Sequence, residues 1–201
     1  MNSFIHRIRV LRTRVISIMV VLLLCYPIVL SQHTLNIHSI SRRDGLSNGA
    51  VNAIAKDKDG YMWFGTWNGL NRFDGNNITS YLPGVNSDAI HNHVIREIYP
   101  TASGSIWMLT NKGLSLYDNV YNHFTPFFDA ESEFINFEND IAISYSEHNG
   151  VFASVYGRGL FKYDNTTSQF KKISFNKASQ LISHKIKRIH QTDSSIYGIT
   201  A

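Results

Sequence analysis

A sequence pattern that recurs about every 45 residues constrains the fold of this chain more than any other feature. Each copy runs through a turn, a short apolar strand, a second turn, a Gly-Leu pair and an aromatic-Asp pair. The copies begin at Asp59, Ser103 and Asn149. The aromatic residue of the apolar strand falls, in steps of 44, 45 and 45 residues, at Trp63, Trp107, Phe152 and Tyr197. Units of this length built from short strands are typical of β-propeller blades.

The first copy divides into four short apolar segments that predict antiparallel strands. These segments are 50–56, 61–66, 70–74 and 78–82, and turn residues such as Asp74, Gly75 and Asn76 separate them. No helical periodicity lies between them, so the repeats are expected to be all-β, in a sandwich, a barrel or a propeller. The length of the period selects the propeller.

The repeats predict an incomplete β-propeller of about three and a half four-stranded blades. The expected divisions are a leading strand and linker at 32–45, blade 1 at 46–84, blade 2 at 89–128, blade 3 at 134–175 and a truncated blade 4 at 181–201. Because a ring needs about four blades or more, we expect an open arc whose unpaired blade faces make the isolated chain aggregation-prone. Residues 34–40 alternate like a strand and are expected to join a final blade outside the chain.

The first 31 residues differ from the repeats and are typical of an export signal peptide. Four arginines without an acidic residue precede the apolar run 15–30. The small residues Val29 and Ser31 predict cleavage after Ser31, and an uncleaved signal anchor is the alternative. Without the leader the chain keeps 15 basic and 15 acidic residues and loses Cys25, its one cysteine. The neutral remainder gives no support to a nucleic-acid partner, and it holds no disulfide.

The repeated apolar and glycine positions are interpreted as scaffold. Apolar residues at equivalent places in stacked units build the core between those units, while glycines supply turns with positive φ or allow a close backbone approach. The predicted structural residues are Trp63, Gly65, Gly69, Leu70, Trp107, Gly113, Leu114, Phe152, Gly159 and Leu160, together with the aromatic residues Phe73, Tyr117 and Tyr163.

The first copy also resembles a known repeat family. The pattern of the two-component regulator propeller repeat is carried by Ile54, Asp57, Gly60, Trp63, Gly65, Thr66, Gly69 and Leu70. The preceding residues 44–47, Asp-Gly-Leu-Ser, are similar to the start of the sensor region in hybrid two-component regulators of Bacteroides-type bacteria. The second and third copies depart from the pattern at 108–109 and 153–154.

The resemblance implies the N-terminal periplasmic part of a sensor histidine kinase that is anchored in the bacterial inner membrane and forms a homodimer. Such sensors respond to oligosaccharides from polysaccharide breakdown and control transcription of genes for glycan use. Their kinase modules lie outside this chain, so we expect the chain itself to be non-catalytic. It would reach the membrane only through a downstream helix or an uncleaved leader.

No group of residues in the sequence predicts catalysis, a metal site or a cofactor. Residues 57–60, Asp-Lys-Asp-Gly, look like half of a calcium loop but lack its further ligands, and we interpret them as a hairpin turn. His91 and His93 have the spacing of one strand face, yet two histidines without a third ligand are a weak indication of zinc. A surface loop is the preferred interpretation of that segment.

The binding residues of a rigid propeller are expected on the loops of one rim. The turns between second and third strands share a face with the loops between blades. An aromatic ring there can stack on a sugar while amide and guanidinium groups bind its hydroxyls; the alternative is ordinary turn residues or contacts to a neighbouring domain. The candidate ligand-binding residues are Trp67, Asn68, Tyr156 and Arg158. Further residues expected on this rim are Asn48, Asp88, His91, Asn92, Lys112, Asn136 and Asp140.

Two other classes of protein stay open at this point. One is an exported propeller enzyme, a glycan lyase or hydrolase, which needs paired carboxylates converging on the central channel. The inner-strand segments hold few acidic residues. The other class is a non-catalytic propeller that binds proteins. A membrane span followed by kinase motifs further along the reading frame would separate the sensor from both.

Overall fold

The computed structural model describes residues 2–29, 37–84, 89–128, 141–174 and 186–200 of the 201-residue chain. The chain divides into two compact units, 1–39 and 40–201. The first unit contains the helix α1 (Asn2–Val29), which falls inside the predicted leader 1–31. Within the described ranges, no helix is long and apolar enough to cross a membrane. Export of the chain and cleavage of its leader stay predictions.

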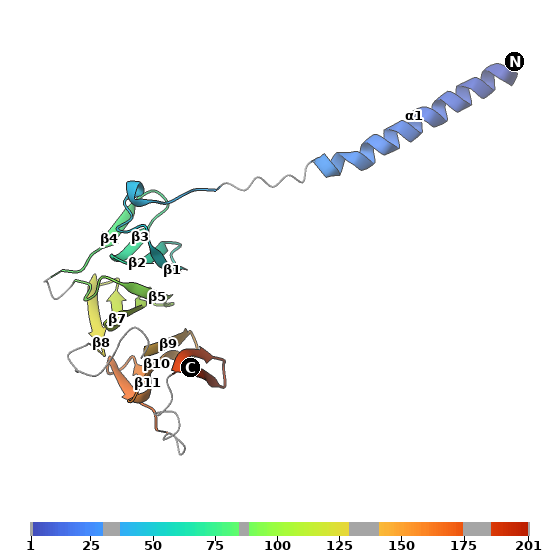
Figure 1. Ribbon diagram of the computed structural model, residues 1–201. Coiled ribbons are helices and arrows are strands. Elements are labelled where there is room, and N and C mark those ends of the chain that lie inside the picture. Colours follow the sequence, from blue (N-terminus) through green and yellow to red (C-terminus); the bar gives the residue numbers. More distant parts are fainter. Residues whose placement is uncertain (1, 30–36, 85–88, 129–140, 175–185, 201) are drawn as a thin grey trace. The chain divides into compact units, whose positions relative to one another are not determined.

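The second unit is built from short strands, drawn as arrows in Figure 1. Three sheets have four antiparallel strands each and a fourth has two, always in chain order. Blade 1 contains β1 (Val51–Lys56), β2 (Met62–Thr66), β3 (Gly69–Phe73) and β4 (Ile78–Tyr81). Blade 2 contains β5 (Ile95–Pro100), β6 (Ile106–Thr110), β7 (Gly113–Asp118) and β8 (His123–Phe127). Blade 3 contains β9 (Ile141–Ser146), β10 (Gly150–Val155), β11 (Gly159–Asp164) and β12 (Gln169–Lys172), and the last hairpin contains β13 (Ile186–Gln191) and β14 (Ile196–Thr200). The all-β prediction for the repeats is confirmed.

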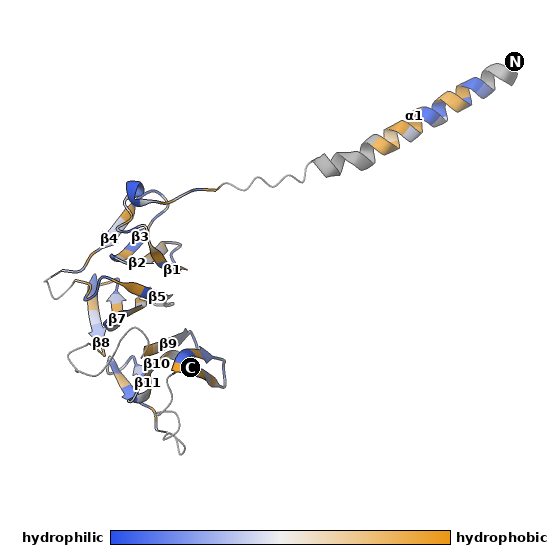
Figure 2. Ribbon diagram, viewed as in Figure 1, coloured by the Kyte–Doolittle hydropathy of each residue, from blue (hydrophilic) through white to orange (hydrophobic). Residues whose placement is uncertain are grey.

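The strands of the first blade begin and end within one residue of their predicted bounds. The second strand of each complete blade lies inside its sheet, and β6 is buried along its whole length. In Figure 2 the strands carry both apolar and polar colours, whereas the short 3-10 helix η1 (Arg42–Asp44) is hydrophilic. Because these second strands are apolar and buried, a regular spacing of aromatic residues marks the blades.

The ten predicted structural residues, from Trp63 to Leu160, are all buried, and two glycines show why no side chain fits there. Gly113 has a φ of +127°, and a Cβ on it would lie 2.7 Å from the carbonyl oxygen of Phe128. Gly65 has an ordinary backbone, but a Cβ there would lie 2.7 Å from Cγ2 of Ile95 in the next blade. Gly65 therefore permits the close packing of blade 2 on blade 1.

Neighbouring blades pack through aromatic side chains. Between blades 1 and 2 the ring centroids of Trp63 and Tyr117 are 5.6 Å apart. Between blades 2 and 3 those of Trp107 and Tyr163 are 4.8 Å apart. Both tryptophans are almost fully buried, whereas Tyr163 and Phe73 are half-buried. These contacts bury enough apolar surface to make each interface between blades a hydrophobic core of its own.

The two ends of this stack expose residues whose counterparts are buried inside it. Ile54 on β1 is 62% exposed, while Ile98 at the same place on β5 is 9% exposed. Tyr197 on β14 is 56% exposed, although its counterpart Trp107 is buried. Tyr197 is exposed because no described blade covers that side of the last hairpin, as expected for an open arc. No closed ring forms in the part of the chain that the structure describes.

The segment before the first blade packs on that blade as an irregular loop. Leu46 is 5% exposed, and the Ser47 amide donates to Oδ1 of Asn71 over 2.9 Å. Nδ2 of Asn71 donates in turn to Oγ of Ser47 over 2.8 Å. Among residues 34–40, the predicted strand is absent over 37–40, which are irregular, and 34–36 lie outside the described residues. The blade that this segment is expected to join lies outside the chain, so the pairing stays a prediction.

Candidate functional site

Trp67 is the candidate binding residue with the best defined geometry. It lies in the turn between β2 and β3, and its side chain is 57% exposed. The indole Nε1 donates to Oδ1 of Asn52 over 3.0 Å. Nδ2 of Asn52 donates to the carbonyl oxygen of Ile95, also over 3.0 Å. The exposed ring is therefore held in one orientation by a side chain that is itself fixed to the next blade, as a binding surface for a flat ligand requires.

Asn68 joins the same turn to the loop between blades 1 and 2. Its side-chain Oδ1 lies 3.2 Å from Nδ1 of His93, and its backbone amide donates to Oγ1 of Thr66 over 3.0 Å. The amide of the next residue, Gly69, donates to the carbonyl oxygen of His93 over 2.6 Å. We predicted that the turns between second and third strands lie on the same face as the loops between blades, and these contacts confirm it for blade 1.

The other two candidates lie in the equivalent turn of blade 3. Tyr156 is 47% exposed, and the Arg158 amide donates to the carbonyl oxygen of Val155 over 3.0 Å. Blade 2, with Lys112 in its own turn, stands between this pair and Trp67. The four predicted residues therefore form two pairs on one rim, and blade 2 separates the pairs.

Two of the further rim candidates, Asn48 and Asn92, hold the backbone of their own turns. Oδ1 of Asn48 accepts from the Ala50 amide over 2.8 Å, and Oδ1 of Asn92 accepts from the Val94 amide over 2.9 Å. His91 is exposed in the loop between blades 1 and 2. The last three candidates lie outside the described residues: Asp88, Asn136 and Asp140.

The segment 57–60 is the predicted hairpin turn, between β1 and β2. Oδ1 of Asp57 accepts from the amides of Asp59 and Tyr61 over 3.0 Å each. Oδ2 of Asp57 accepts from Nε1 of Trp63 over 2.7 Å. Both carboxylate oxygens are therefore used in holding the turn to the core tryptophan. The described residues include no cluster of three or more His, Cys, Asp or Glu side chains that could hold a metal ion.

A polar cavity lies on the first strand of each blade, and we call these first strands the inner strands. The sequence did not predict this cavity. It has a volume of about 660 Å³ and is lined by residues of β1, β5, β9 and β13. Glu97 of β5 lies there and accepts the hydroxyl of Tyr99 over 2.6 Å. Burial, followed by this hydrogen bond and the negative charge of Glu97, raises the pKa of Tyr99. The sequence contained one indication of the cavity, namely charged pairs at 96–97 and 187–188 inside otherwise apolar strands.

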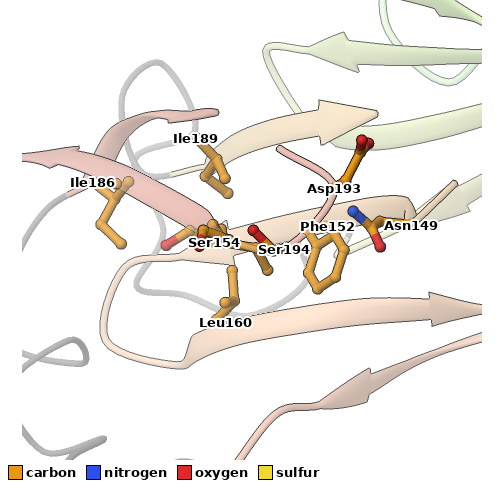
Figure 3. Close-up of a pocket in the computed structure, with 11 residues that line it drawn as sticks. Asn149, Phe152, Ser154, Leu160, Ile186, Ile189, Asp193 and Ser194 are labelled. Atoms are coloured by element: carbon orange, nitrogen blue, oxygen red, sulfur yellow. The ribbon is translucent and has the colours of Figure 1, made fainter. Parts of the chain in front are cut away.

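A second cavity, shown in Figure 3, lies between blade 3 and the β13–β14 hairpin. Its volume is about 380 Å³, and Phe152, Leu160 and Ile186 are among its lining residues. At the equivalent interface between blades 1 and 2, Tyr117 of β7 and Phe124 of β8 contribute to the core. The last hairpin has no described third or fourth strand to supply such side chains. We therefore interpret this cavity as space between blades and not as a ligand site.

Comparison with known proteins finds similarity to a propeller repeat family and to solved propeller structures. Residues 45–68 match the two component regulator propeller family. The structure is similar to the extracellular domain of a putative hybrid two-component system from Bacteroides thetaiotaomicron, with a TM-score of 0.64 and 26% identity over 80% of this chain and 23% of that one. The extracellular domain of another such system from the same bacterium has a TM-score of 0.55 and 21% identity, over 79% of this chain and 22% of that one.

A likeness in fold alone extends to an enzyme. Virginiamycin B lyase from Staphylococcus aureus has a TM-score of 0.52 and 11% identity, over 74% of this chain and 48% of that one. No curated protein sequence matches the chain.

The successive four-stranded blades and these likenesses define the class of protein, an incomplete β-propeller, and the prediction of this fold is confirmed. More specifically, residues 45–68, which include β1 and β2 of the first blade, are similar to the two-component regulator propeller repeat. The chain resembles the extracellular part of a hybrid two-component system and spans 23% of the length of that domain.

Proposed function

We propose that this chain belongs to the periplasmic ligand-sensing region of a two-component sensor histidine kinase or hybrid regulator, and that its ligand is an oligosaccharide. The observation that carries the proposal is a two-component regulator propeller repeat in a chain that is 26% identical to an extracellular domain of such a system. The parent protein would be a homodimer anchored in the inner membrane, and it would control transcription of genes for glycan use.

The rim of the first blade supports an oligosaccharide as the ligand. Sugar rings bind proteins through an aromatic face together with hydrogen-bonding groups at the edge of that face. Trp67 offers a ring in fixed orientation, and Asn68 and His93 lie beside it in the same turn and loop. Because the ring is held before ligand arrives, binding there costs little conformational entropy.

The inner strands do not favour a glycan lyase or hydrolase. Such enzymes commonly use two carboxyl groups on either side of the scissile bond. Over the described strands β1, β5, β9 and β13, the one acidic residue is Glu97, and the hydroxyl of Tyr99 already donates to it. These strands therefore lack the pair of acids that the reaction requires, and sensing stays the preferred function.

Replacing the rim tryptophan tests the proposed ligand site. In the full natural chain, Trp67→Ala should weaken oligosaccharide binding by roughly tenfold, because it removes a stacking surface worth about 1 kcal/mol or more. Isothermal titration calorimetry against a panel of neutral and acidic oligosaccharides measures the change. Tyr121→Ala is the matched control, because Tyr121 is an 80% exposed aromatic residue in the β7–β8 turn, at the opposite end of its blade. Equal binding by Trp67→Ala and the natural chain would exclude this rim as the site.

A further inference from the structure

A further polar cavity lies between blades 2 and 3, and we call it the blade 2–3 cavity. Its volume is about 350 Å³, which is near the lower limit for a small-molecule site. It includes residues of the β5–β6 and β9–β10 turns, whereas Trp67 lies in a β2–β3 turn, at the other end of a blade. Its lining residues include Ser103, Trp107, Tyr145, Glu147, Tyr163 and Asn165.

The buried indole of Trp107 has an N–H group without a protein acceptor. Trp107 is 3% exposed and lines the cavity. In blade 1 the equivalent Nε1 of Trp63 donates to Oδ2 of Asp57 over 2.7 Å. Thr101 takes the place of Asp57 in blade 2, and its hydroxyl donates instead to the carbonyl oxygen of Ser105 over 2.9 Å. No described residue accepts from Nε1 of Trp107, so this donor is available to a ligand, whereas a buried indole N–H usually has a partner.

The N–H group of Trp107 is accessible to solvent. Among the described residues, the fully buried side-chain atoms that lack a hydrogen-bond partner are Nε of Arg72 and Oγ of Ser115. Nε1 of Trp107 also lacks a partner and is not one of these atoms, so part of its surface is accessible. The equivalent Nε1 of Trp63 points toward its own β1–β2 turn, and residues of the matching β5–β6 turn line the cavity. The donor of Trp107 therefore faces the cavity.

The cavity exists because a short side chain takes the place of a long one. Arg72 pairs across the sheet with Trp63 in blade 1, and Leu116 pairs with Trp107 in blade 2. The guanidinium carbon of Arg72 lies over the ring of Trp63, 5.9 Å from its centroid. Leu116 lines the cavity and is too short to cover Trp107 in the same way. Blades 2 and 3 each have four strands, so this space, unlike the one beside the last hairpin, does not reflect an incomplete sheet.

The groups around the cavity include both donors and acceptors. The hydroxyl of Tyr145 accepts from the backbone amide of Ala102 over 3.2 Å, and its own proton is available for a second bond. Glu147 and Asn165 line the cavity from exposed positions in turns. Of the described lining residues, Glu147 alone is charged, and it is negative at neutral pH. This set suits a neutral ligand with several hydroxyl groups, because each hydroxyl can both donate and accept.

We propose that the blade 2–3 cavity binds one neutral sugar ring, and that Nε1 of Trp107 donates to one of its hydroxyl oxygens. Tyr163 is half-buried and lines the cavity, so its ring offers an apolar surface to the C–H face of the sugar. Glu147 accepts from further hydroxyls of the same ring. The inference goes beyond the proposed function, because this second site lies at the other end of the blades and does not require Trp67.

Indole N–H resonances test the site in the full natural chain labelled with ¹⁵N-tryptophan. The chain has three tryptophans, and the signal that is lost in Trp107→Phe belongs to Trp107. The probes are the methyl glycosides of glucose, galactose, mannose, xylose and arabinose, with that of glucuronic acid as the charged comparison. We expect one neutral probe to shift the Trp107 signal in a saturable way. The glucuronic acid probe should bind at least about tenfold more weakly, because Glu147 repels its carboxylate.

Three variants separate binding from folding. Trp107→Phe keeps an aromatic ring in the core and should bind the preferred sugar about tenfold more weakly in calorimetry, since it lacks the donor. Trp63→Phe is the matched control and should bind that sugar as the natural chain does. It should nevertheless unfold at a lower urea concentration than Trp107→Phe, because it leaves the Asp57 carboxylate without its donor. Glu147→Gln, at an exposed position, should bind the glucuronic acid probe about as tightly as the neutral one.

The same titrations distinguish the blade 2–3 cavity from the rim with Trp67, whose signal is identified by its loss in Trp67→Ala. A Trp107 signal that no probe shifts would overturn the inference, and so would equal sugar binding by Trp107→Phe and the natural chain. A shift of the Trp67 signal alone would support the rim site and overturn the cavity site. A shift of the Trp107 signal alone would support the cavity site and count against the rim site.

Discussion

Tyr117 shows how single side chains join the first two blades. It is 2% exposed, its hydroxyl lies 3.1 Å from that of Tyr81, and it donates to Oδ1 of Asn122 over 3.0 Å. Burial, followed by the hydrogen bond with Tyr81, raises the pKa of Tyr117 above its ordinary value of 10.0. A raised pKa in the folded state means that the folded chain holds this proton more tightly than the unfolded chain does. The stabilisation that comes from this tighter binding of the Tyr117 proton is complete below about pH 10, and it is lost as the pH rises further.

Alkaline unfolding of the Tyr117→Phe variant tests this linkage. The variant should be less stable than the natural chain near neutral pH by about 1 kcal/mol, because it loses a hydrogen bond at a buried site. Its free energy of unfolding should fall less steeply between about pH 9 and pH 11, because one titrating group is gone. Urea titrations at several pH values measure both effects, with the exposed Tyr121→Phe as control. An identical pH slope in Tyr117→Phe and the natural chain would contradict the argument.

Residues that obey the repeat could be predicted from the sequence, and residues that depend on strand pairing could not. The step between Trp63 and Trp107 sufficed to predict the blades, because equivalent positions in stacked units face equivalent neighbours. The polar cavity was missed, since the register shifts beside Arg96 in β5 and Lys187 in β13, which line it, are a property of two paired strands and leave no fixed pattern in one of them. Trp67 was singled out because it is an aromatic residue outside the repeated positions, and its role in ligand binding stays a prediction.

At the scale of elements, the buried side-chain amide of Asn71 makes two of the hydrogen bonds that hold the loop before the first blade. Asn71 of β3 is fully buried, and its side chain contacts Ser47, the carbonyl oxygen of Phe64 and the hydroxyl of Ser80. The equivalent residue of blade 2 is Ser115, so the amide is specific to the blade that carries the loop. The loop thereby covers part of a blade face that no other described blade covers.

Replacing this amide should detach the loop from the blade. Asn71→Ala leaves the Ser47 amide without its acceptor and should lower the free energy of unfolding by about 2 kcal/mol. Limited trypsin digestion should also cleave faster after Arg42 and Arg43 of η1, because the segment opens more often. Asn76→Ala, in the exposed β3–β4 turn, is the matched control. A cleavage rate equal to that of the control would show that the loop is held by other contacts.

At the scale of the whole molecule, the described blades have an apolar face at each end that no described blade covers. On the β1 side, Val51 is 36% exposed, whereas Ile95, at the same place in blade 2, is completely buried. On the β14 side, Ile199 and Tyr197 are more than half exposed. Faces of this kind are covered by the next blade when a propeller ring closes. The number of repeats predicted an open arc with unpaired blade faces, and the exposure of these residues agrees with that prediction.

The measurement that tests the central claim most directly is the coding sequence beyond the codon for Ala201. If the chain belongs to a two-component sensor, the reading frame should continue through further repeats of about 45 residues to a membrane-spanning helix and a histidine kinase. Those repeats would supply the blades that cover Ile54 and Tyr197. A stop codon at this point, together with a stable secreted product of this size, would contradict the sensor proposal and leave a short propeller that buries its open faces by self-association.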